Sequence, residues 1–310
     1  MGNVPHLYIY IVIDMDKKKS LFEIHAAVLL FGLAGLFGKW LILSPFIIVL
    51  GRVFFASITL ALLLWFSKQS MKVSPKKNYL SFIFLGLILA VHWVSFFKSI
   101  QISTVAVGLF SFATYPVFTT FLEPLLLKEK IVKMNISFSL FCVAGVFLII
   151  PSFGLDNSTF VGVLWGMLSS ITFAVLTILN RKLTQHFSSL LIAFYQDFFA
   201  MLFLLPFYFV LRPALNTNDI LLLCVLGVFC TAGSHTLFIK GMKRIKAQTA
   251  SMIHFLEPVY GIIFAFFLLH EIPSLRIILG GIIILCGQIL IILRIFKKEE
   301  KRCTQNLILK

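Results

Sequence analysis

The chain has 310 residues, of which 60% are hydrophobic and only 13% are charged. A typical soluble domain has about 25% charged residues and could not hide this much apolar surface, so the composition excludes an ordinary soluble protein. The net charge of +15 comes from short basic clusters between apolar runs, which is the usual pattern of loops beside membrane spans. We therefore expect a protein that lies in the lipid bilayer and has no nucleic-acid partner.

The chain begins with a segment too short to span a membrane. Residues 7–13 are apolar, but a span needs about 20 such residues, and three lysines follow at 17–19. We expect residues 1–20 to form an N-terminal tail. Met15, directly before the lysines, is a candidate for the natural start in place of Met1.

Ten apolar runs of membrane length follow. They are continuous and do not alternate with polar residues, which favours helices over the strands of a barrel. The sequence therefore predicts an all-α integral membrane protein of ten transmembrane helices. The predicted spans lie at 21–40, 45–66, 79–98, 104–127, 134–151, 160–180, 189–211, 219–239, 247–269 and 274–296.

The second half of the chain repeats the first at an offset of 142 residues. This predicts a first repeat at 21–151, a second at 160–296 and a basic C-terminal tail at 297–310. Phe121–Pro124 also reappears as 255–258, an offset of 134, but that register aligns few other residues. The residues that recur at 142 are Phe96, Lys98, Pro116, Val117, Leu126, Leu127, Glu129, Gly145, Leu148 and Ile149, as Phe238, Lys240, Pro258, Val259, Leu268, Leu269, Glu271, Gly287, Leu290 and Ile291.

The basic residues predict the orientation. If both termini are cytoplasmic, 22 of the 27 Lys and Arg fall on the cytoplasmic side and four on the other, in agreement with the positive-inside rule. Each half then has five spans, an odd number, so the two repeats are inverted with respect to each other. Inverted repeats are typical of secondary transporters that work by alternating access. We expect the protein in the cytoplasmic (inner) membrane.

Two segments carry a resemblance to a known family. The first half has VAVGLF at 105–110, YPVF at 115–118 and LKE at 127–129. The second half has ASM at 250–252, EPVY at 257–260 and LHE at 269–271. Together with Arg52 four residues before Ala56, this pattern resembles the EamA family of the drug/metabolite transporter superfamily. The resemblance spans residues 21–296.

The resemblance implies a carrier of small metabolites, often amino acids or related compounds, without a cofactor, a metal or catalytic residues. It implies a central cavity lined by helices three, four, eight and nine. S-adenosylmethionine, a nucleoside-like metabolite, is an alternative substrate to be taken up. Lys98 and Lys240 depart from the commoner family pattern. Equivalent by repeat, they are either charged rims at opposite membrane faces or interfacial anchors.

Ionisable residues inside spans are costly and are functional candidates. Arg52 either meets an anionic group or fixes helix packing, and we favour a structural or gating role. Asp197 lies near the corresponding place in the second half. His254 and Glu257 share a helix face and either pass a proton, the candidate coupling ion, or form a structural pair beside a helix kink at Pro258. Pro116 predicts the equivalent kink in the first half.

The remaining candidates for substrate contact are on helices three, four and eight: His92, Trp93, Phe96, Ser111, Phe112, Tyr115 and His235. Aromatic residues at helical spacing are also common in plain packing, so both readings stay open. We expect Glu123 to be exposed near the cytoplasmic interface. We expect Glu129 and Glu271, at span ends, to meet lysines or helix N-termini.

A transporter is thus the expected function. An integral membrane enzyme is disfavoured because the sequence has no HExxH motif and no paired catalytic Ser and Lys. A passive channel is a third class, since channels also contain inverted repeats. The sequence leaves the oligomeric state, the direction of transport and the substrate open.

Overall fold

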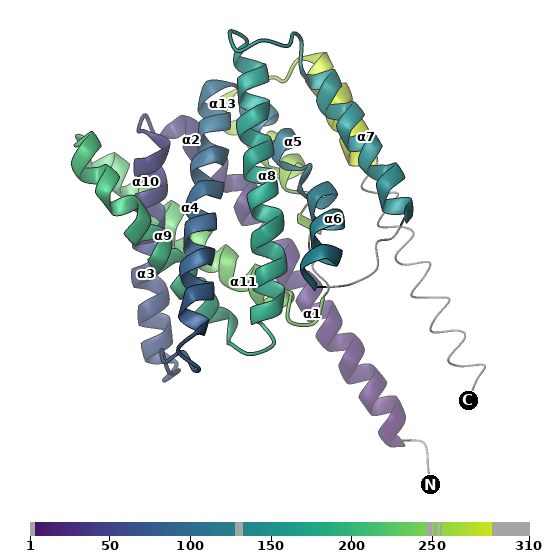
Figure 1. Ribbon diagram of the computed structural model, residues 1–310, viewed down its shortest axis with the longest axis vertical. Coiled ribbons are helices and arrows are strands. Elements are labelled where there is room, and N and C mark those ends of the chain that lie inside the picture. Colours follow the sequence, from purple (N-terminus) through teal and green to yellow (C-terminus); the bar gives the residue numbers. More distant parts are fainter. Residues whose placement is uncertain (1–3, 128–132, 246–249, 251–252, 255, 287–310) are drawn as a thin grey trace.

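The computed structural model describes residues 4–127, 133–245, 250, 253, 254 and 256–286, and within them it contains helices and no strands. Figure 1 shows the helices packed as one bundle, with α1 projecting beyond it at its N-terminal end. The helices are α1 (Val4–Ala34), α2 (Phe37–Trp40), α3 (Pro45–Phe66), α4 (Asn78–Ile102), α5 (Val105–Phe112), α6 (Tyr115–Leu127), α7 (Lys133–Ile149), α8 (Ser158–Leu183), α9 (Ser189–Leu211), α10 (Thr217–Gly227), the π-helix η1 (Val228–Gly233), α11 (Ser234–Gly241) and α13 (Glu257–Leu269).

The described residues include seven helical segments that are long and apolar enough to cross a membrane. Shorter apolar helices occupy Ser139–Ile149, Glu257–Leu269 and Leu275–Cys286, within the predicted spans 134–151, 247–269 and 274–296. The chain is therefore a multi-pass membrane protein, while ten crossings stay a prediction. The seven segments are Lys18–Trp40, Pro45–Phe66, Asn78–Ile102, Val105–Leu126, Ser158–Leu183, Ser189–Leu211 and Thr217–Gly241.

Several predicted spans contain interruptions among the described residues. The predicted span 21–40 is divided between α1, which already begins at Val4, and α2. The predicted span 104–127 is two helices, α5 and α6, separated by a turn at Ala113 and Thr114. The predicted span 219–239 contains η1, in which the helix widens to i→i+5 hydrogen bonding.

The expected kinks at Pro116 and Pro258 are helix starts. Pro116 is the second residue of α6, and Pro258 is the second residue of α13. Proline has no backbone N–H, and the first turn of a helix is where that donor is not needed. Each proline therefore follows a break in the helix and does not bend a continuous one.

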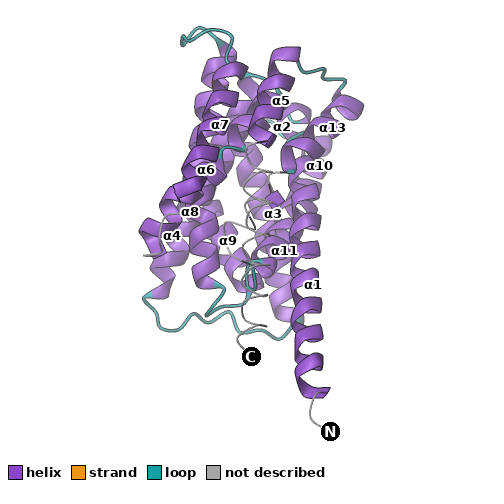
Figure 2. Ribbon diagram, turned by 90° about the vertical axis from the view of Figure 1, so that its right-hand side faces the viewer, coloured by secondary structure: helices purple, strands orange, loops and turns teal. Residues whose placement is uncertain are grey.

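The packing joins helices from both halves. Helix α4 lies against α8 and α9, α3 lies against α9 and α10, and α1 lies against α11 and α13. Figure 2, turned by 90°, shows α1 running along α11 toward α2. Large apolar side chains such as Trp65, Phe66 and Phe209 are exposed on the outside, as suits a surface that faces lipid. Arg52, Asp197 and Glu257, by contrast, are buried within the bundle.

Helices α4 and α9 meet at Gly86, where there is no room for a methyl group. A Cβ at this position would overlap Cβ of Phe199 and lie 2.8 Å from the backbone nitrogen of Ala200. Neither atom belongs to the flexible end of a side chain, so the helices would have to separate. We expect Gly86→Ala to lower the free energy of unfolding by about 1–3 kcal/mol, measured as a lower Tm in detergent.

Gly35 provides the matched control for this substitution. A Cβ there would meet its nearest neighbour, the carbonyl oxygen of Gly32, at 3.5 Å, an ordinary contact distance. Gly35→Ala is therefore expected to leave Tm nearly unchanged. Equal Tm values for the Gly86→Ala variant and the unmodified protein would contradict the close α4–α9 packing.

Candidate functional site

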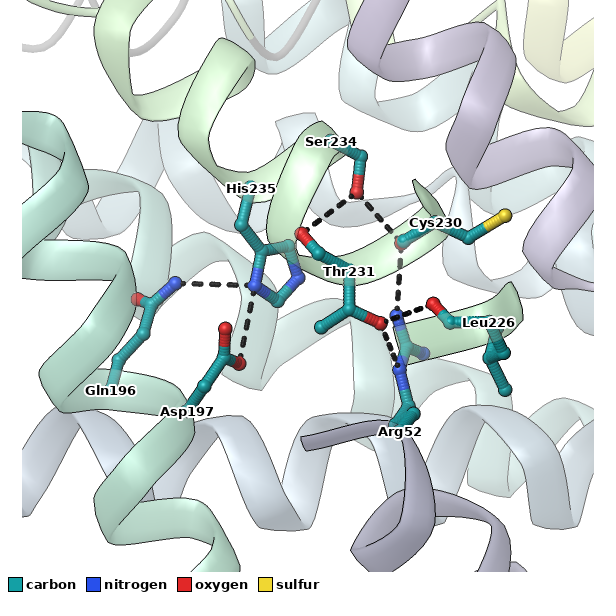
Figure 3. A network of polar contacts seen from close by, with 8 residues as sticks. All are labelled: Arg52, Gln196, Asp197, Leu226, Cys230, Thr231, Ser234 and His235. Carbon is teal, nitrogen blue, oxygen red and sulfur yellow. Dashed lines mark hydrogen bonds and ion pairs between the residues drawn. The ribbon is translucent and has the colours of Figure 1, made fainter. Parts of the chain in front are cut away.

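Arg52 is a fully buried cation on α3, with 0% of its surface exposed. Its Nε donates to Oγ1 of Thr231 at 3.0 Å, and its Nη2 donates to the carbonyl of Cys230 at 3.2 Å (Figure 3). Its guanidinium carbon lies 3.5 Å from the centre of the Trp93 ring, a close cation–π contact. Arg52 therefore joins α3 to η1 and to α4 at once.

The π-helix supplies both acceptors that hold Arg52. Oγ1 of Thr231 donates to the carbonyl of Leu226, five residues earlier, at 2.7 Å. The carbonyl of Cys230 also accepts from Oγ of Ser234 at 2.7 Å. A widened turn leaves carbonyls free of the ordinary helical pattern, and such turns are frequent at functional sites. The arginine therefore binds where the helix departs from α geometry.

Asp197 lies beside His235 and not against Arg52. Its Oδ1 is 3.3 Å from Nδ1 of His235, and Nε2 of Gln196 is 3.4 Å from the same Nδ1 (Figure 3). A proton on Nδ1 faces the carboxylate, whereas a bare Nδ1 accepts a hydrogen bond from the amide. The tautomer of the imidazole therefore decides which α9 side chain Nδ1 binds.

His254 and Glu257 lie next to each other, as their spacing of three residues predicts. Nδ1 of His254 is 3.1 Å from Oε2 of Glu257, although the two atoms are not aligned for a hydrogen bond. Both residues are almost completely buried, at 2% and 1% exposed. Glu257 is the first residue of α13, so the break in the helix brings its carboxylate to the interior.

Five aromatic rings enclose the imidazole of His254, and we call them the aromatic cage. Their centroids lie 4.5–5.6 Å from the imidazole centroid. The cage draws on α1, α5, α6, α8 and α11, and thus on both halves of the chain. Its members are Phe31, Phe112, Tyr115, Phe173 and Phe238.

The offset of 142 connects the members of this centre. Phe31 corresponds to Phe173, and Phe112 corresponds to His254. Two such pairs are in direct contact, since Phe112 and His254 have centroids 5.6 Å apart and Trp93 and His235 have stacked rings 6.1 Å apart. Phe31 and Phe173 were not among the predicted site residues, although the offset pairs them.

His92, Phe96 and Ser111 complete the wall beside the cage. Nδ1 of His92 lies 3.0 Å from the carbonyl and 2.9 Å from Oγ of Ser169 on α8. Phe96 packs edge-on against Phe112 at 5.5 Å. Ser111 is completely buried. These residues lie with the other predicted substrate contacts, and His92 is anchored to α8 through Ser169.

Several polar atoms at this centre form no hydrogen bond within the described part of the chain, although all are buried. Buried polar atoms are normally hydrogen-bonded, so a group of orphaned ones marks a place where a partner binds. Both signs of charge are represented. The atoms are Nη1 of Arg52, Nε1 of Trp93, Oγ of Ser111, Oε1 of Gln196, both carboxylate oxygens of Asp197, Nδ1 of His254 and both carboxylate oxygens of Glu257.

The other predicted charges lie outside this centre. Lys98 is half-buried, and Nζ of Lys240 is 2.7 Å from Oε1 of Glu23 on α1. The expected exposure of Glu123 is wrong, because the residue is 1% exposed. Its carboxylate accepts a 2.7 Å hydrogen bond from Arg181, which α8 brings against α6.

Glu271 meets a helix N-terminus, as its place at a span end predicts. Its two carboxylate oxygens accept from the backbone N–H groups of Val105 and Ala106 at 3.3 and 3.4 Å, at the start of α5. A carboxylate is favourable there because the first N–H groups of a helix have no partner within it. Glu129, its counterpart in the first half, lies outside the described residues.

Comparison with solved structures agrees with the fold. A crystal structure superposes with a TM-score of 0.66 at 15% identity, covering 87% of this chain and 95% of that one. At this level of identity the match concerns the fold alone.

Several proteins with sequences similar to this chain are named as transporters. An uncharacterized transporter of Bacillus subtilis (strain 168), YxxF, is 24% identical over 288 residues, 90% of this chain and 91% of that one. An uncharacterized transporter of Helicobacter pylori (strain J99) is 28% identical over 286 residues, 88% of this chain and 94% of that one. The S-adenosylmethionine uptake transporter of Rickettsia prowazekii (strain Madrid E) is 26% identical over 253 residues, 81% of this chain and 83% of that one.

The profile of the EamA-like transporter family matches twice, at residues 19–150 and 160–293. The two matches fall on the two halves that the offset of 142 defines. Together with the named relatives, they indicate a transporter and not an enzyme. The chain therefore belongs to the EamA-like transporter family, within the drug/metabolite transporter superfamily.

Proposed function

We propose that the chain is a secondary transporter in which two inverted five-helix repeats give alternating access to a central site for a small metabolite. The observation that carries this proposal is the group of orphaned buried polar atoms where helices of both halves meet. A membrane protein that buries Arg52, Asp197 and Glu257 at its centre with polar atoms that form no hydrogen bond sustains a desolvation cost, which a bound substrate offsets.

The packing supports a duplicated arrangement of the helices. Helix α4 packs on α8 in much the same way as α11 packs on α1, and α6 packs on α8 as α13 packs on α1. These are the pairs that the offset of 142 relates. Two equivalent packings, one centred on α8 and one on α1, suit a carrier with two arrangements of similar energy.

The chemistry of the centre favours a substrate that carries both an anionic and a cationic group. Nη1 of Arg52 is a free donor for a carboxylate, while the carboxylates of Asp197 and Glu257 are free acceptors for an ammonium group. The rings of the aromatic cage, which enclose His254 in this structure, would attract a cation or stack on a planar group as the centre opens. An amino acid or a related compound fits this combination.

An S-adenosylmethionine-like metabolite is the second candidate. The aromatic cage offers faces for an adenine ring and for a sulfonium cation, and a relative 26% identical to this chain is named as an S-adenosylmethionine uptake transporter. Competition between amino acids and nucleoside-like compounds in the same assay separates the two candidates.

The orientation we propose has both termini on the cytoplasmic side of the inner membrane. The connections 67–77 and 184–188 gather at the end of the bundle from which α1 projects (Figure 1). The 67–77 connection, the end of α8 with Arg181 and Lys182, and the segment 240–244 contain many of the lysines and arginines on which the predicted orientation depends.

Purified protein with Trp93→Ala is expected to lose substrate stabilisation. Amino acids, amines and nucleoside-like compounds are screened for a rise in Tm, and a ligand present at 100 times its Kd stabilises by about 2.7 kcal/mol. Trp93 is 3% exposed beside Arg52, whereas Trp65 is 73% exposed on the outside. Trp65→Ala, the matched control, is expected to keep the full ligand-induced shift.

Flux in liposomes then decides the class of protein. Accumulation of the ligand against its gradient supports the transporter. Flux that only follows the ligand gradient would identify a passive channel, and conversion of the ligand without flux would identify an enzyme.

A further inference from the structure

The end of the bundle away from the N-terminus of α1 is held together by charged contacts. Nζ of Lys39 on α2 donates to the carbonyl oxygen of Ser103, directly after α4, at 2.8 Å. The carboxylate of Glu271, two residues after α13, accepts from the N–H groups of Val105 and Ala106 at the start of α5, and it also attracts the ammonium group of Lys39. We call Lys39 and Glu271 the latch. Figure 2 shows α2, α5 and α13 together at this end.

The helices that meet at the latch also reach the central site. Phe31 of the aromatic cage precedes Lys39 by eight positions. Phe112, another cage residue, is the last residue of α5, whose first N–H groups are held by Glu271. Glu257 is the first residue of α13, and Glu271 follows the other end of that helix. At 1.5 Å per residue, the length of α5 places the latch about 10 Å from the cage.

An apolar layer lies between the latch and the cage. Ile100 of α4 and Leu109 of α5 are both fully buried. A Cβ on Gly108 would overlap Cγ1 of Ile100, and one on Gly38 would lie 3.0 Å from Cγ2 of the same residue. A Cβ on Gly261 of α13 would overlap Cδ1 of Leu109. The side chain of Leu109 therefore lies directly on α13, where the two halves of the chain touch.

The contacts of the latch can be exchanged for water. Lys39 and Glu271 are both partly exposed, in contrast to Arg52, and charged contacts of this kind are weakened by competition with water. Helix α5 also keeps a cap of its own, because Oγ1 of Thr104 accepts from the N–H of Val107 at 3.1 Å. Loss of Glu271 therefore frees α5 from α13 without removing every cap at the start of α5.

The repeat provides a related contact at the other end of the bundle. Lys39 corresponds to Arg181 at the offset of 142. Arg181, near the end of α8, lies 2.7 Å from the carboxylate of Glu123 on α6, so this pair also joins the two halves. Glu129, the counterpart of Glu271, lies outside the described residues. A charged contact between the halves is thus present at each end, which suits a carrier that opens to each side in turn.

We propose that the latch is the gate of the carrier on the non-cytoplasmic side. It is closed in this structure and opens when α13 and Glu271 separate from the start of α5. The proposal rests on the alternating access and the orientation proposed above. It assigns to Lys39 and Glu271 a role in the transport cycle that involves no contact with the substrate. Removal of either charge therefore favours the arrangement that is open to the non-cytoplasmic side.

The test measures how fast a membrane-impermeant maleimide labels Leu109→Cys in sealed vesicles of known orientation, with the five native cysteines replaced by alanine. We expect Glu271→Ala and Lys39→Met each to raise the labelling rate from the side away from the termini by at least about fivefold. The rate from the side of the termini is expected not to rise. Asp156→Asn is the matched control, since it removes an exposed carboxylate from the α7–α8 connection at the same end (Figure 1) and is expected to leave the rate unchanged.

A one-sided rise distinguishes an opened gate from a loosened fold. The proposal is overturned if either variant leaves the rate unchanged or raises it equally from both sides, or if Asp156→Asn raises it as much. Labelling requires neither substrate nor flux. A failed flux assay therefore counts against the proposed function, whereas unchanged labelling counts against the latch alone.

Discussion

Arg52→Ala is expected to reduce transport by more than about tenfold and to lower Tm, because one side chain joins three helices. A hydrogen bond from a charged group contributes about 1.5–3 kcal/mol, and a desolvated cation–π contact contributes about 2 kcal/mol. The substitution removes the two bonds to η1 and the contact with Trp93. The acceptors left behind retain other bonds, since Ser234 still donates to the carbonyl of Cys230.

Arg52→Lys distinguishes a structural arginine from a simple positive charge. Lysine keeps the charge but lacks the planar fork that reaches Thr231 and Cys230 together. We expect this variant to lose about as much flux and Tm as Arg52→Ala, because the fork holds α3 against η1. Substantial flux with Arg52→Lys would instead assign the charge itself to substrate binding.

A matched arginine outside the centre serves as the control. Arg276 is exposed and makes one hydrogen bond, of 2.6 Å, to the carbonyl of Leu148. Arg276→Ala is expected to keep flux within about twofold of the unmodified protein, since surface substitutions usually change stability by about 0.5 kcal/mol or less. Wild-type flux and Tm for Arg52→Ala would contradict the role of the buried cation.

Glu257→Gln is expected to abolish accumulation driven by a pH gradient while substrate exchange continues. Glutamine has the same shape and still reaches His254, but it cannot gain or lose a proton in the cycle. The carboxylate has no hydrogen bond among the described residues and lies 3.1 Å from the imidazole. It is therefore free to exchange a proton as the centre opens to each side.

The readouts for Glu257→Gln are uptake under an imposed pH gradient and counterflow without one. Glu123→Gln removes another buried carboxylate, one already hydrogen-bonded to Arg181 at 2.7 Å. That control is expected to lower Tm and keep the response to the pH gradient. Accumulation by Glu257→Gln that still depends on the pH gradient would disprove proton coupling through this residue.

Local sequence patterns predicted much of the centre. The spacing of His254 and Glu257 placed them on one helix face, and they lie in contact. The offset of 142 matched Trp93 with His235, whose rings stack in the bundle. An ionisable residue in an apolar span is costly in contact with lipid and is therefore expected inside the bundle. The interior position of Arg52 could thus be predicted from the sequence.

Other features depend on tertiary neighbours that no local pattern contains. Glu123 is buried because Arg181 reaches it from α8, 58 positions along the chain. The offset of 142 pairs Phe31 with Phe173, but their contacts with His254 depend on tertiary packing. The widened turn η1 was not predicted, because it has the same apolar composition as the helices around it.

The widened turn also changes the phase of the helix that contains it. Successive residues of an α-helix are about 100° apart around the helix axis. One extra residue in a turn therefore rotates all later side chains by about that angle relative to an uninterrupted helix. Leu223 before the turn packs at Gly51 of α3, and His235 after it faces Asp197 of α9. One membrane crossing therefore presents an apolar edge to one neighbour and a polar edge to another.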